Sequence, residues 1–268
     1  MINRFVLIVV SFIFLISYKV TANNLQGVSG DVIAVKTNIT SSKSLTFKYN
    51  ASEYQLVGLP YVFKTENRNI NNLNIEVQYK NFGESRITIT DLSKVDLSKT
   101  DRERANSEAL LIRKAVNSYD ISITPSFNFI NPVQGVISSR YGKQRFINDK
   151  PRSPHLALDI AANTGAEISA PLKGKIILTG DFFYTGNTII IDHGFGLISS
   201  YSHLDSISVN ESQIVQQGDL IGAVGETGRV TGPHLHWTVY LNKERINPEK
   251  LLKEDYLKNL FKIAKDTF

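Results

Sequence analysis

The residues that could do chemistry in this sequence of 268 residues are concentrated in its C-terminal half. All five histidines lie in the last 114 residues: His155, His193, His203, His234 and His236. The chain contains no cysteine, which excludes thiol nucleophiles and thiolate metal sites. Any bound transition metal must therefore be held by histidine, aspartate and glutamate side chains.

His234 and His236 lie two positions apart in a segment that favours a strand. Residues 233–240 are rich in β-branched and aromatic side chains. Side chains at i and i+2 of a strand lie on one face, so both imidazoles point the same way while Leu235 points into the core. A metal site, or one ligand beside one base, would use such a pair. Two histidines on an exposed sheet face are the alternative.

His155 and Asp159 form a second pair, four positions apart, in a segment that we also predict to be a strand. Pro154 precedes the pair, and Asn-Thr-Gly at residues 163–165 follows it, which leaves little room for a helix. On a strand the two side chains share a face. Neutral imidazole and carboxylate are both good zinc donors, at about 2.0–2.2 Å. A salt-linked surface pair is the alternative.

His203, at the end of a predicted strand, is the third part of the pattern. Zinc-dependent hydrolysis needs three protein donors, an open position for water, and groups that move protons and stabilise an oxyanion. His155, Asp159 and one of the pair His234 and His236 could supply the donors. The other member of the pair and His203 could supply the remaining groups.

The elements that must position these side chains are mainly strands. We predict a small β domain over residues 23–97, sandwich-like or barrel-like, from strands at 31–36, 44–49, 55–59, 73–79 and 86–90. A charged, helix-favouring segment follows and predicts a helical linker over residues 98–125 with a hinge near Pro125. The expected apolar stripe of this helix is Ala109, Leu110, Ile112 and Val116.

Residues 126–268 predict the domain that carries the candidate site. Strands are expected at 135–138, 174–178, 187–192, 197–201, 220–224 and 234–241, with frequent glycines between them. Glycine permits the tight turns of hairpins, so the pattern indicates an antiparallel sheet. Residues 248–267 predict one amphipathic helix packed against this same domain. Its expected apolar face is Leu252, Tyr256, Leu260 and Ile263.

Residues 1–22 predict a secretory signal peptide. The uncharged apolar run at 5–17 follows Arg4 and is shorter than the roughly 20 residues that span a bilayer. An uncleaved N-terminal anchor is the alternative, and either reading places the rest of the chain in the periplasm or cell envelope. The formal charge is +5, of which Arg4 and Lys19 contribute two, leaving +3. This charge is too small to indicate a nucleic-acid partner.

Over residues 132–252 the sequence resembles the lysostaphin-type zinc endopeptidases of bacterial cell walls, a group that includes the β-lytic metallopeptidases. A weaker similarity to the N-terminal domain of some exported members covers the segment before it. The matching blocks are residues 139–142 (Ser-Arg-Tyr-Gly), 155–159, 163–165, 186–187 (Gly-Asn), 192–194 (Asp-His-Gly), 201–204 (Tyr-Ser-His-Leu), 215–222 (VQQGDLIG), 225–228 (GETG) and 231–236 (TGPHLH).

The resemblance implies a mainly β, antiparallel-sheet domain of the duplicated-hybrid-motif type with an open groove. It also implies that His155, Asp159 and His236 bind one zinc ion and that His203 and His234 act on water and on the transition state. His193 is expected to be structural. Ala157 and Tyr141 replace the Gly and Phe of many members, and neither position supplies a donor.

The function implied by the resemblance is hydrolysis of peptide cross-links in bacterial peptidoglycan by an exported zinc metalloendopeptidase. A D,D-endopeptidase is favoured over a glycyl-glycine endopeptidase. The alternative is a catalytically inactive relative that binds peptidoglycan or activates an amidase, and the presence of every donor argues against it. The expected partners are peptidoglycan stem peptides, with membrane contact only if the leader is retained. The small β domain could position the enzyme, contact a partner or cover the groove.

Overall fold

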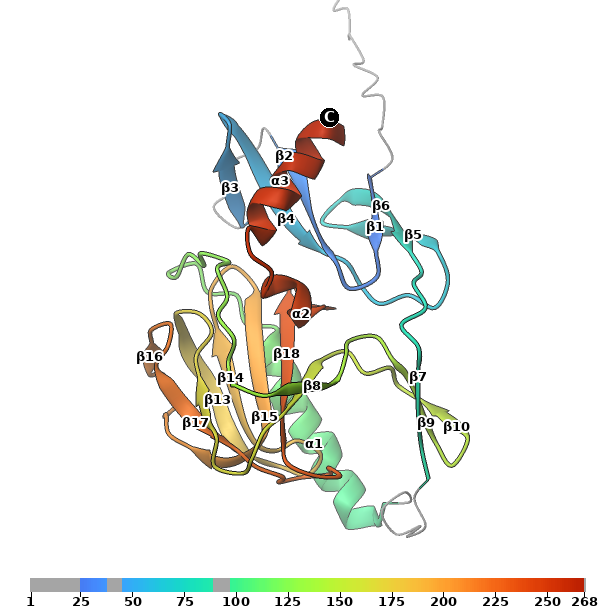
Figure 1. Ribbon diagram of the computed structural model, residues 1–268, viewed down its shortest axis with the longest axis vertical. Coiled ribbons are helices and arrows are strands. Elements are labelled where there is room, and N and C mark those ends of the chain that lie inside the picture. Colours follow the sequence, from blue (N-terminus) through green and yellow to red (C-terminus); the bar gives the residue numbers. More distant parts are fainter. Residues whose placement is uncertain (1–24, 38–44, 89–96, 268) are drawn as a thin grey trace, which may run out of the picture.

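The computed structural model describes residues 25–37, 45–88 and 97–267, with side chains described through residue 264 (Figure 1). The predicted signal peptide lies outside these residues. The fold is mainly β, as predicted, and consists of a small N-terminal β lobe above a large sheet. Within the described part of the chain, no helix combines the length and apolar character needed to span a bilayer.

The N-terminal β lobe is built from two small sheets, with strand orders β2-β4-β3 and β1-β6-β5. Val35, Val57, Ile75 and Val77 are buried between the sheets, so the lobe is sandwich-like. The strongly polar strand β5 was not predicted, because only its pairing with β6 marks it as a strand. The strands are β1 (Leu25–Val28), β2 (Val32–Thr37), β3 (Thr46–Tyr49), β4 (Ser52–Gly58), β5 (Glu66–Ile70) and β6 (Leu73–Gln78).

The large sheet is antiparallel throughout, with the order β16-β13-β14-β15-β18-β11-β8. β17 pairs with β12 and β15, and β19 pairs with β18. All six strands predicted here are present, and the short strands β12, β16 and β19 were missed. The strands are β8 (Val136–Ser139), β11 (Leu158–Ala161), β12 (Glu167–Ser169), β13 (Gly174–Phe182), β14 (Gly186–Asp192), β15 (Leu197–Ile207), β16 (Ile214–Val215), β17 (Leu220–Val224), β18 (His234–Leu241) and β19 (Glu244–Ile246).

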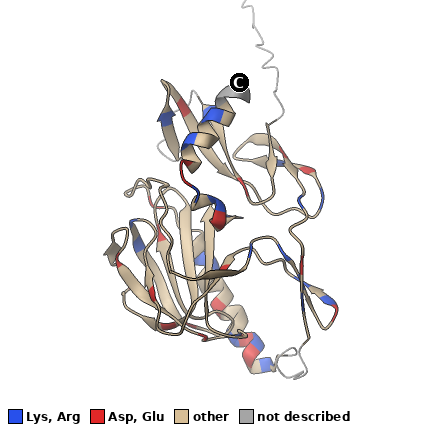
Figure 2. Cartoon of the chain, viewed as in Figure 1, with Lys and Arg blue, Asp and Glu red and all other residues tan. Residues whose placement is uncertain are grey.

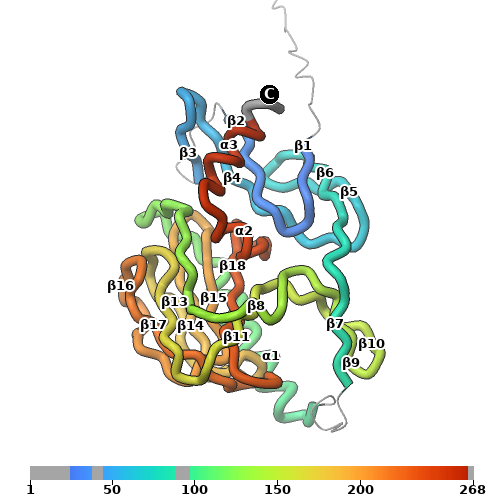
Figure 3. The backbone as a smooth tube through the Cα atoms, in the orientation of Figure 1, coloured from blue at the N-terminus to red at the C-terminus, as the bar shows by residue number. Residues whose placement is uncertain are grey.

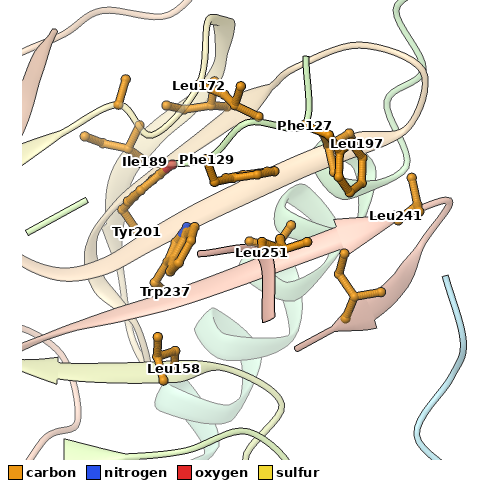
Figure 4. Packing of buried hydrophobic residues seen from close by; sticks show 14 of the residues in the cluster. Phe127, Phe129, Leu158, Leu172, Ile189, Leu197, Tyr201, Trp237, Leu241 and Leu251 are labelled. Carbon is orange, nitrogen blue, oxygen red and sulfur yellow. The ribbon is translucent and has the colours of Figure 1, made fainter. Parts of the chain in front are cut away.

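One face of the large sheet is the hydrophobic core. Alternation along β18 sends Leu235, Trp237, Val239 and Leu241 into it, and all four are fully buried. The Trp237 ring lies 6.1 Å from that of Phe129, and Figure 4 shows the two rings packed among leucine side chains. The segment that carries two site histidines is therefore held in place by its alternate side chains.

Helix α1 (Lys99–Val116) packs on part of the opposite face. Ala115 joins Ile190 and Ile198 in a separate buried cluster, and Ile112 packs against it. The helix begins after Ser98, whose side chain accepts a hydrogen bond from the backbone N–H of Asp101. Figure 2 shows the charged residues of both signs along the rest of the helix. The predicted apolar stripe is wrong at two positions.

Those positions are Ala109, which is exposed, and Leu110, whose exposed fraction is 62%. The helix has a narrower buried face than the sequence suggests, with Ala105 and Ala115 as its fully buried residues. Small side chains allow the backbone of the helix to lie close to the sheet. An alanine carries little weight in a search for an apolar stripe, so the sequence pattern was displaced toward the larger leucine.

A fourth sheet, of three strands, connects the two parts of the molecule. Strand β7 (Glu84–Ile87) pairs in parallel with β9 (Gln144–Ile147), which forms a hairpin with β10 (Lys150–Arg152) (Figure 3). We had assigned the segment of β7 to the small β domain, yet its partner strand lies beyond the linker. The domain boundaries at 97 and 125 stay a prediction, and the pairing of β7 with β9 joins segments on either side of them.

The C-terminal segment corrects the prediction of one helix. It forms α2 (Pro248–Leu251) and α3 (Tyr256–Thr267), separated by a break in which Asp255 has a φ of 56°. Helix α3 packs on the N-terminal β lobe against β2 and not on the large sheet, as Figure 1 shows. Phe261 is the centre of this contact, since its ring lies 5.3 Å from those of Tyr49 and Tyr54.

The apolar face of the C-terminal segment differs from the prediction at one residue. Leu252, Tyr256 and Leu260 pack against the core as predicted, whereas Ile263 is 66% exposed. The buried face of α3 is centred on Leu260, Phe261 and Ala264, so Ile263 lies beyond its edge.

Candidate metal centre and groove

Three predicted donors meet at one point of the large sheet. Asp159 lies on β11 directly opposite His236 on β18, and His155 approaches from the preceding loop. Asp159 Oδ1 lies 2.7 Å from His236 Nδ1 and 3.0 Å from His155 Nε2, and these two nitrogens are 3.3 Å apart. The three side chains thus form a compact group that could hold a metal ion.

His155 reaches this group in a way that the sequence did not indicate. It precedes β11 and is not part of a strand, so the shared strand face that we predicted for His155 and Asp159 is wrong. Two backbone hydrogen bonds fix the residue instead: its N–H donates to Lys143 O, and its carbonyl accepts from the N–H of Gly142. The side chain is almost fully buried.

Backbone carbonyls determine the tautomers of three histidines. The Nδ1 atoms of His155, His203 and His234 lie 3.1, 2.9 and 2.8 Å from the carbonyl oxygens of Arg140, Thr227 and Gly232, respectively. A carbonyl oxygen only accepts, so each Nδ1 carries the hydrogen and each Nε2 carries a lone pair when the ring is neutral. This is the arrangement that orients histidine ligands in metal sites.

The donor group suits a cation. The lone pair of His155 Nε2 faces the Asp159 carboxylate at 3.0 Å, and two acceptors at this distance repel unless positive charge lies between them. Four donors arranged tetrahedrally at the bond lengths of zinc are separated by about 3.4 Å. The separations of 2.7–3.3 Å are slightly shorter than this value. The residues therefore fit a divalent metal with imidazole and carboxylate ligands.

The Asp159 carboxylate is ionised in this setting. Burial acts to raise its pKa, but the neighbouring imidazoles of His155 and His236 lower it more, and the pKa lies well below its usual range. Burial also lowers the pKa of His236. A neutral imidazole and an ionised carboxylate are the forms that bind a metal.

His203 is aimed at the site by a bulge. Tyr201 on β15 points into the core, so strict alternation would send His203 there as well. Instead, the pairing of β14 with β15 shifts register between Tyr201 and Leu204, and His203 has a φ of 68°. A positive φ is uncommon for residues other than glycine and is concentrated at functional sites. The bulge turns the imidazole toward His234.

His203 and His234 form the second half of the site. Their ring centroids are 5.0 Å apart, and His203 lies 5.6 Å from His236. His234 Nε2 lies 3.9 Å from Asp159 Oδ1. His203, His234 and His236 could also hold a metal ion, but only the group with Asp159 offers a negative charge to the cation. Burial, followed by the His236 charge, lowers the pKa of His203 to about 4.

His193 lies apart from the site, in the core. Its Nδ1 donates to Lys173 O at 2.8 Å, and its Nε2 lies 2.7 Å from Ser199 Oγ. Full burial lowers its pKa to about 4, which keeps the ring neutral. It belongs to neither group that could hold a metal, in agreement with the structural role expected for it.

A groove of about 1060 Å³ borders the metal centre. Its floor is the face of the large sheet that carries His236, and α1 closes one side. Tyr61 and Phe63 of the N-terminal β lobe and the hairpin β9–β10 contribute the other walls. We did not predict the two arginines of this hairpin, Arg145 and Arg152, as site residues. The only signal was their charge near His155 in the sequence.

An antiparallel β fold with an imidazole and carboxylate donor set, two further histidines and an open groove defines the class of metal-dependent hydrolases. Known proteins place the chain more narrowly. The model of Peptidase family M23 matches residues 153–248. A solved structure from Pseudomonas aeruginosa, described as a peptidase M23, is 30% identical over 84% of this chain and 94% of that one, with a TM-score of 0.66. The chain therefore belongs to peptidase family M23.

Two curated relatives show similarity to the region of the site. Vibrio cholerae peptidoglycan DD-endopeptidase ShyA is 36% identical over 42% of this chain and 27% of its own length. An uncharacterized metalloprotease of Buchnera aphidicola is 39% identical over 46% of this chain and 34% of its own length. The matches thus span about a third or less of these relatives.

Proposed function

We propose that this protein is an exported zinc metalloendopeptidase that hydrolyses peptide cross-links in bacterial peptidoglycan, with the D,D-endopeptidase reaction favoured. The convergence of His155, Asp159 and His236 within 3.3 Å of one another is the observation that carries the proposal. Membership of family M23 and the similarity to ShyA support a peptidase that acts on peptidoglycan. The apolar leader of residues 5–17 is the basis for placing it in the periplasm or cell envelope.

Zinc bound by the three donors would supply a Lewis acid that polarises the scissile carbonyl and lowers the pKa of water toward about 7. The chain's own residues would do the rest. His234 presents the lone pair of Nε2 to the site, because its Nδ1 donates to Gly232 O. It is placed to accept the proton of the attacking water and to deliver it to the leaving amine.

His203 would orient the attacking water. Its Nδ1 hydrogen is committed to Thr227 O, so a neutral His203 offers an acceptor at Nε2 and not a donor. It could donate to an oxyanion only after taking up a proton. Both histidines present the same tautomer, so the proposed assignment of proton transfer to His234 rests on its place beside the donor group, with Nε2 3.9 Å from Asp159 Oδ1. Water orientation is then the role proposed for His203.

A digest of purified peptidoglycan tests the proposal. The chain without residues 1–22 is expected to release peptide fragments whose masses identify the bond that is cut. Bound metal is measured in parallel. His236→Ala should lose both metal and hydrolysis, because it removes a donor. His234→Asn, the matched variant on the same strand face, should keep the metal and lose hydrolysis.

Two results would count against the proposal. Hydrolysis by a His236→Ala protein that contains no metal would rule out the donor set. Binding of peptidoglycan without release of any fragment, by a wild-type protein loaded with zinc, would instead support the inactive, binding relative considered from the sequence.

A further inference from the structure

The hairpin β9–β10 places two positive charges opposite one another beside the metal centre. Arg145 on β9 and Arg152 on β10 are direct cross-strand partners, so their side chains leave the same face of the hairpin. Both residues line the groove next to His155. Like charges directly opposite in a β ladder are destabilising, which calls for an anion to balance them.

No described carboxylate of the protein supplies that anion. The nearest acidic atom to Arg145 is Asp159 Oδ2 at 4.0 Å, beyond hydrogen-bond reach, and Arg152 has no ion pair among the described residues. Some of the other arginines differ in this respect. Arg140 pairs with Glu249, and Arg104 pairs with Glu108 at 2.6 Å. Arg145 is nevertheless only 38% exposed.

Unpartnered hydroxyl groups on the groove floor are a second, independent sign of a ligand. Ser200, Ser202 and Thr238 line the groove and are at most 7% exposed. Their hydroxyls make no hydrogen bond to any residue that the structure describes, unlike the neighbouring Thr188, which donates to Gly186 O at 2.9 Å. None of the three hydroxyl oxygens is itself a buried atom without a partner, so each is open to the groove and available for a ligand.

The register of the sheet arranges these hydroxyls in a row. Ser202 lies opposite His236, and Ser200 lies opposite Thr238, one step further from the metal centre. Alternation keeps all of them on the groove face of β15 and β18. A peptide lying along the floor would therefore meet hydrogen-bonding groups immediately after the reactive centre.

We propose that the groove selects peptides with a free carboxylate near the scissile bond, with Arg145 and Arg152 binding the carboxylate and the row of Ser200, Ser202 and Thr238 hydrogen-bonding the adjacent peptide groups. Guanidinium and carboxylate form paired, charge-assisted hydrogen bonds. The 4.0 Å between Arg145 and Asp159 limits the carboxylate to the residues next to the bond that is cut. This specificity rests on the proposed function.

Peptide binding, measured separately from turnover, tests the inference. The full chain carrying His234→Asn is titrated calorimetrically with a peptidoglycan stem tetrapeptide, and with the same peptide after amidation of all its carboxylates. Arg145→Gln is expected to weaken binding of the free peptide by about 10- to 100-fold and binding of the amidated peptide hardly at all. Arg152→Gln should act in the same direction.

Arg140→Gln is the matched control. It removes a positive charge close to the site but keeps the backbone carbonyl that orients His155, and the Arg140 side chain pairs with Glu249 and does not line the groove. Its affinity for the free peptide should equal that of the parent. The carboxylate site would be overturned if the parent bound the free and the amidated peptides with equal affinity and Arg145→Gln changed neither affinity.

Selective amidation identifies the source of the carboxylate. If amidation of the C-terminal carboxylate alone removes the effect of Arg145→Gln, the groove binds the carboxylate at the end of a peptide. If amidation of the side-chain carboxylates removes the effect, the groove binds the carboxylate of an internal residue in a cross-linked peptide.

Ser200→Ala tests the floor. It should weaken the free and amidated peptides by the same factor, about 3- to 10-fold, because one hydrogen bond to the peptide is lost in both. Unchanged affinity would show that the row does not contact the ligand. If the wild type binds peptides in a carboxylate-dependent way but hydrolyses none, this inference is supported and the proposed peptidase function is contradicted.

If the wild type hydrolyses free and amidated peptides equally well, the peptidase function is supported and this inference is contradicted.

Discussion

Alternate residues of strands β15 and β18 make the two faces of this part of the sheet, and the two faces differ in polarity and in function. One face buries Tyr201, Leu235 and Trp237 in the core. The other carries Ser202, His236 and Thr238 and borders the groove. Because adjacent side chains point to opposite faces, a single strand can be fixed by one set of residues and equipped for chemistry by the other.

This difference predicts that substitutions on one face change mainly the stability of the protein and substitutions on the other face change mainly its reactivity. A substitution on the groove face removes a functional group without opening a cavity in the core. A substitution on the core face lowers the free energy of unfolding but leaves the groups of the site present in the folded fraction. Four measurements test this separation, from the largest expected effect to the smallest.

Removal of His236, which belongs to both groups that could hold a metal, is expected to have the largest effect. His236→Ala should abolish hydrolysis of peptidoglycan and metal binding, because His236 completes the donor set with His155 and Asp159. In the metal-free state its melting temperature should match that of the metal-free wild type within a few degrees. A large fall in melting temperature would contradict the separation of the two faces. A chelator should reproduce the loss of activity in the wild type.

Truncation of the neighbouring residue on the other face should do the opposite. Trp237→Ala is expected to lower the free energy of unfolding by about 3–5 kcal/mol, since the indole is fully buried beside Phe129. Denaturant titration measures this loss. Below the unfolding transition, the folded fraction should retain metal. Trp237→Phe is the control and should lose less stability, because it leaves a smaller cavity.

His203→Asn tests whether the bulge serves the groove face. Asparagine tolerates a positive φ better than most residues, so the backbone at a φ of 68° should persist while the imidazole is lost. The expected fall in kcat is about 100-fold, with metal content unchanged. An unaltered kcat would show that His203 does not act on the attacking water.

His193 provides a core histidine to compare with those of the groove. Its pKa is about 4 in the folded protein and about 6.5 in the unfolded chain. The unfolded chain therefore binds a proton more readily, so the stability present above pH 6.5 is lost as the pH falls toward 4. The shift corresponds to about 3 kcal/mol. His193→Gln should flatten the pH dependence of the free energy of unfolding in this window. An equal slope in variant and wild type would contradict the assignment.

Much of the site was predictable from sequence because β-branched and aromatic residues mark β18 clearly. The i, i+2 spacing of His234 and His236 then places both rings on one face, as found. The pair His155 and Asp159 was predicted correctly as neighbours for a wrong reason, since a loop anchored by Gly142 brings His155 into place. Long-range backbone hydrogen bonds of this kind have no local sequence signal.

Other features depended on tertiary contacts that no local pattern specifies. Alternation alone would have buried His203, and only the bulge opposite β14 reverses it. The contact of Arg145 with the groove follows from the pairing of β9 with β7, whose partners are more than fifty residues apart. Helix α3 was predicted as amphipathic, but a hydrophobic face does not indicate which surface covers it.

The docking of α3 on the N-terminal β lobe has a consequence for the order of events during synthesis. Tyr54 and Phe47 lie early in the chain, yet they are covered by Phe261, which is made more than two hundred residues later. The lobe therefore keeps an uncovered aromatic surface until the residues of α3 have left the ribosome and any translocation channel. Completion of the native packing is thus delayed until all residues of the reactive centre have been made. Until then, an incomplete chain exposes the aromatic side chains of its N-terminal β lobe.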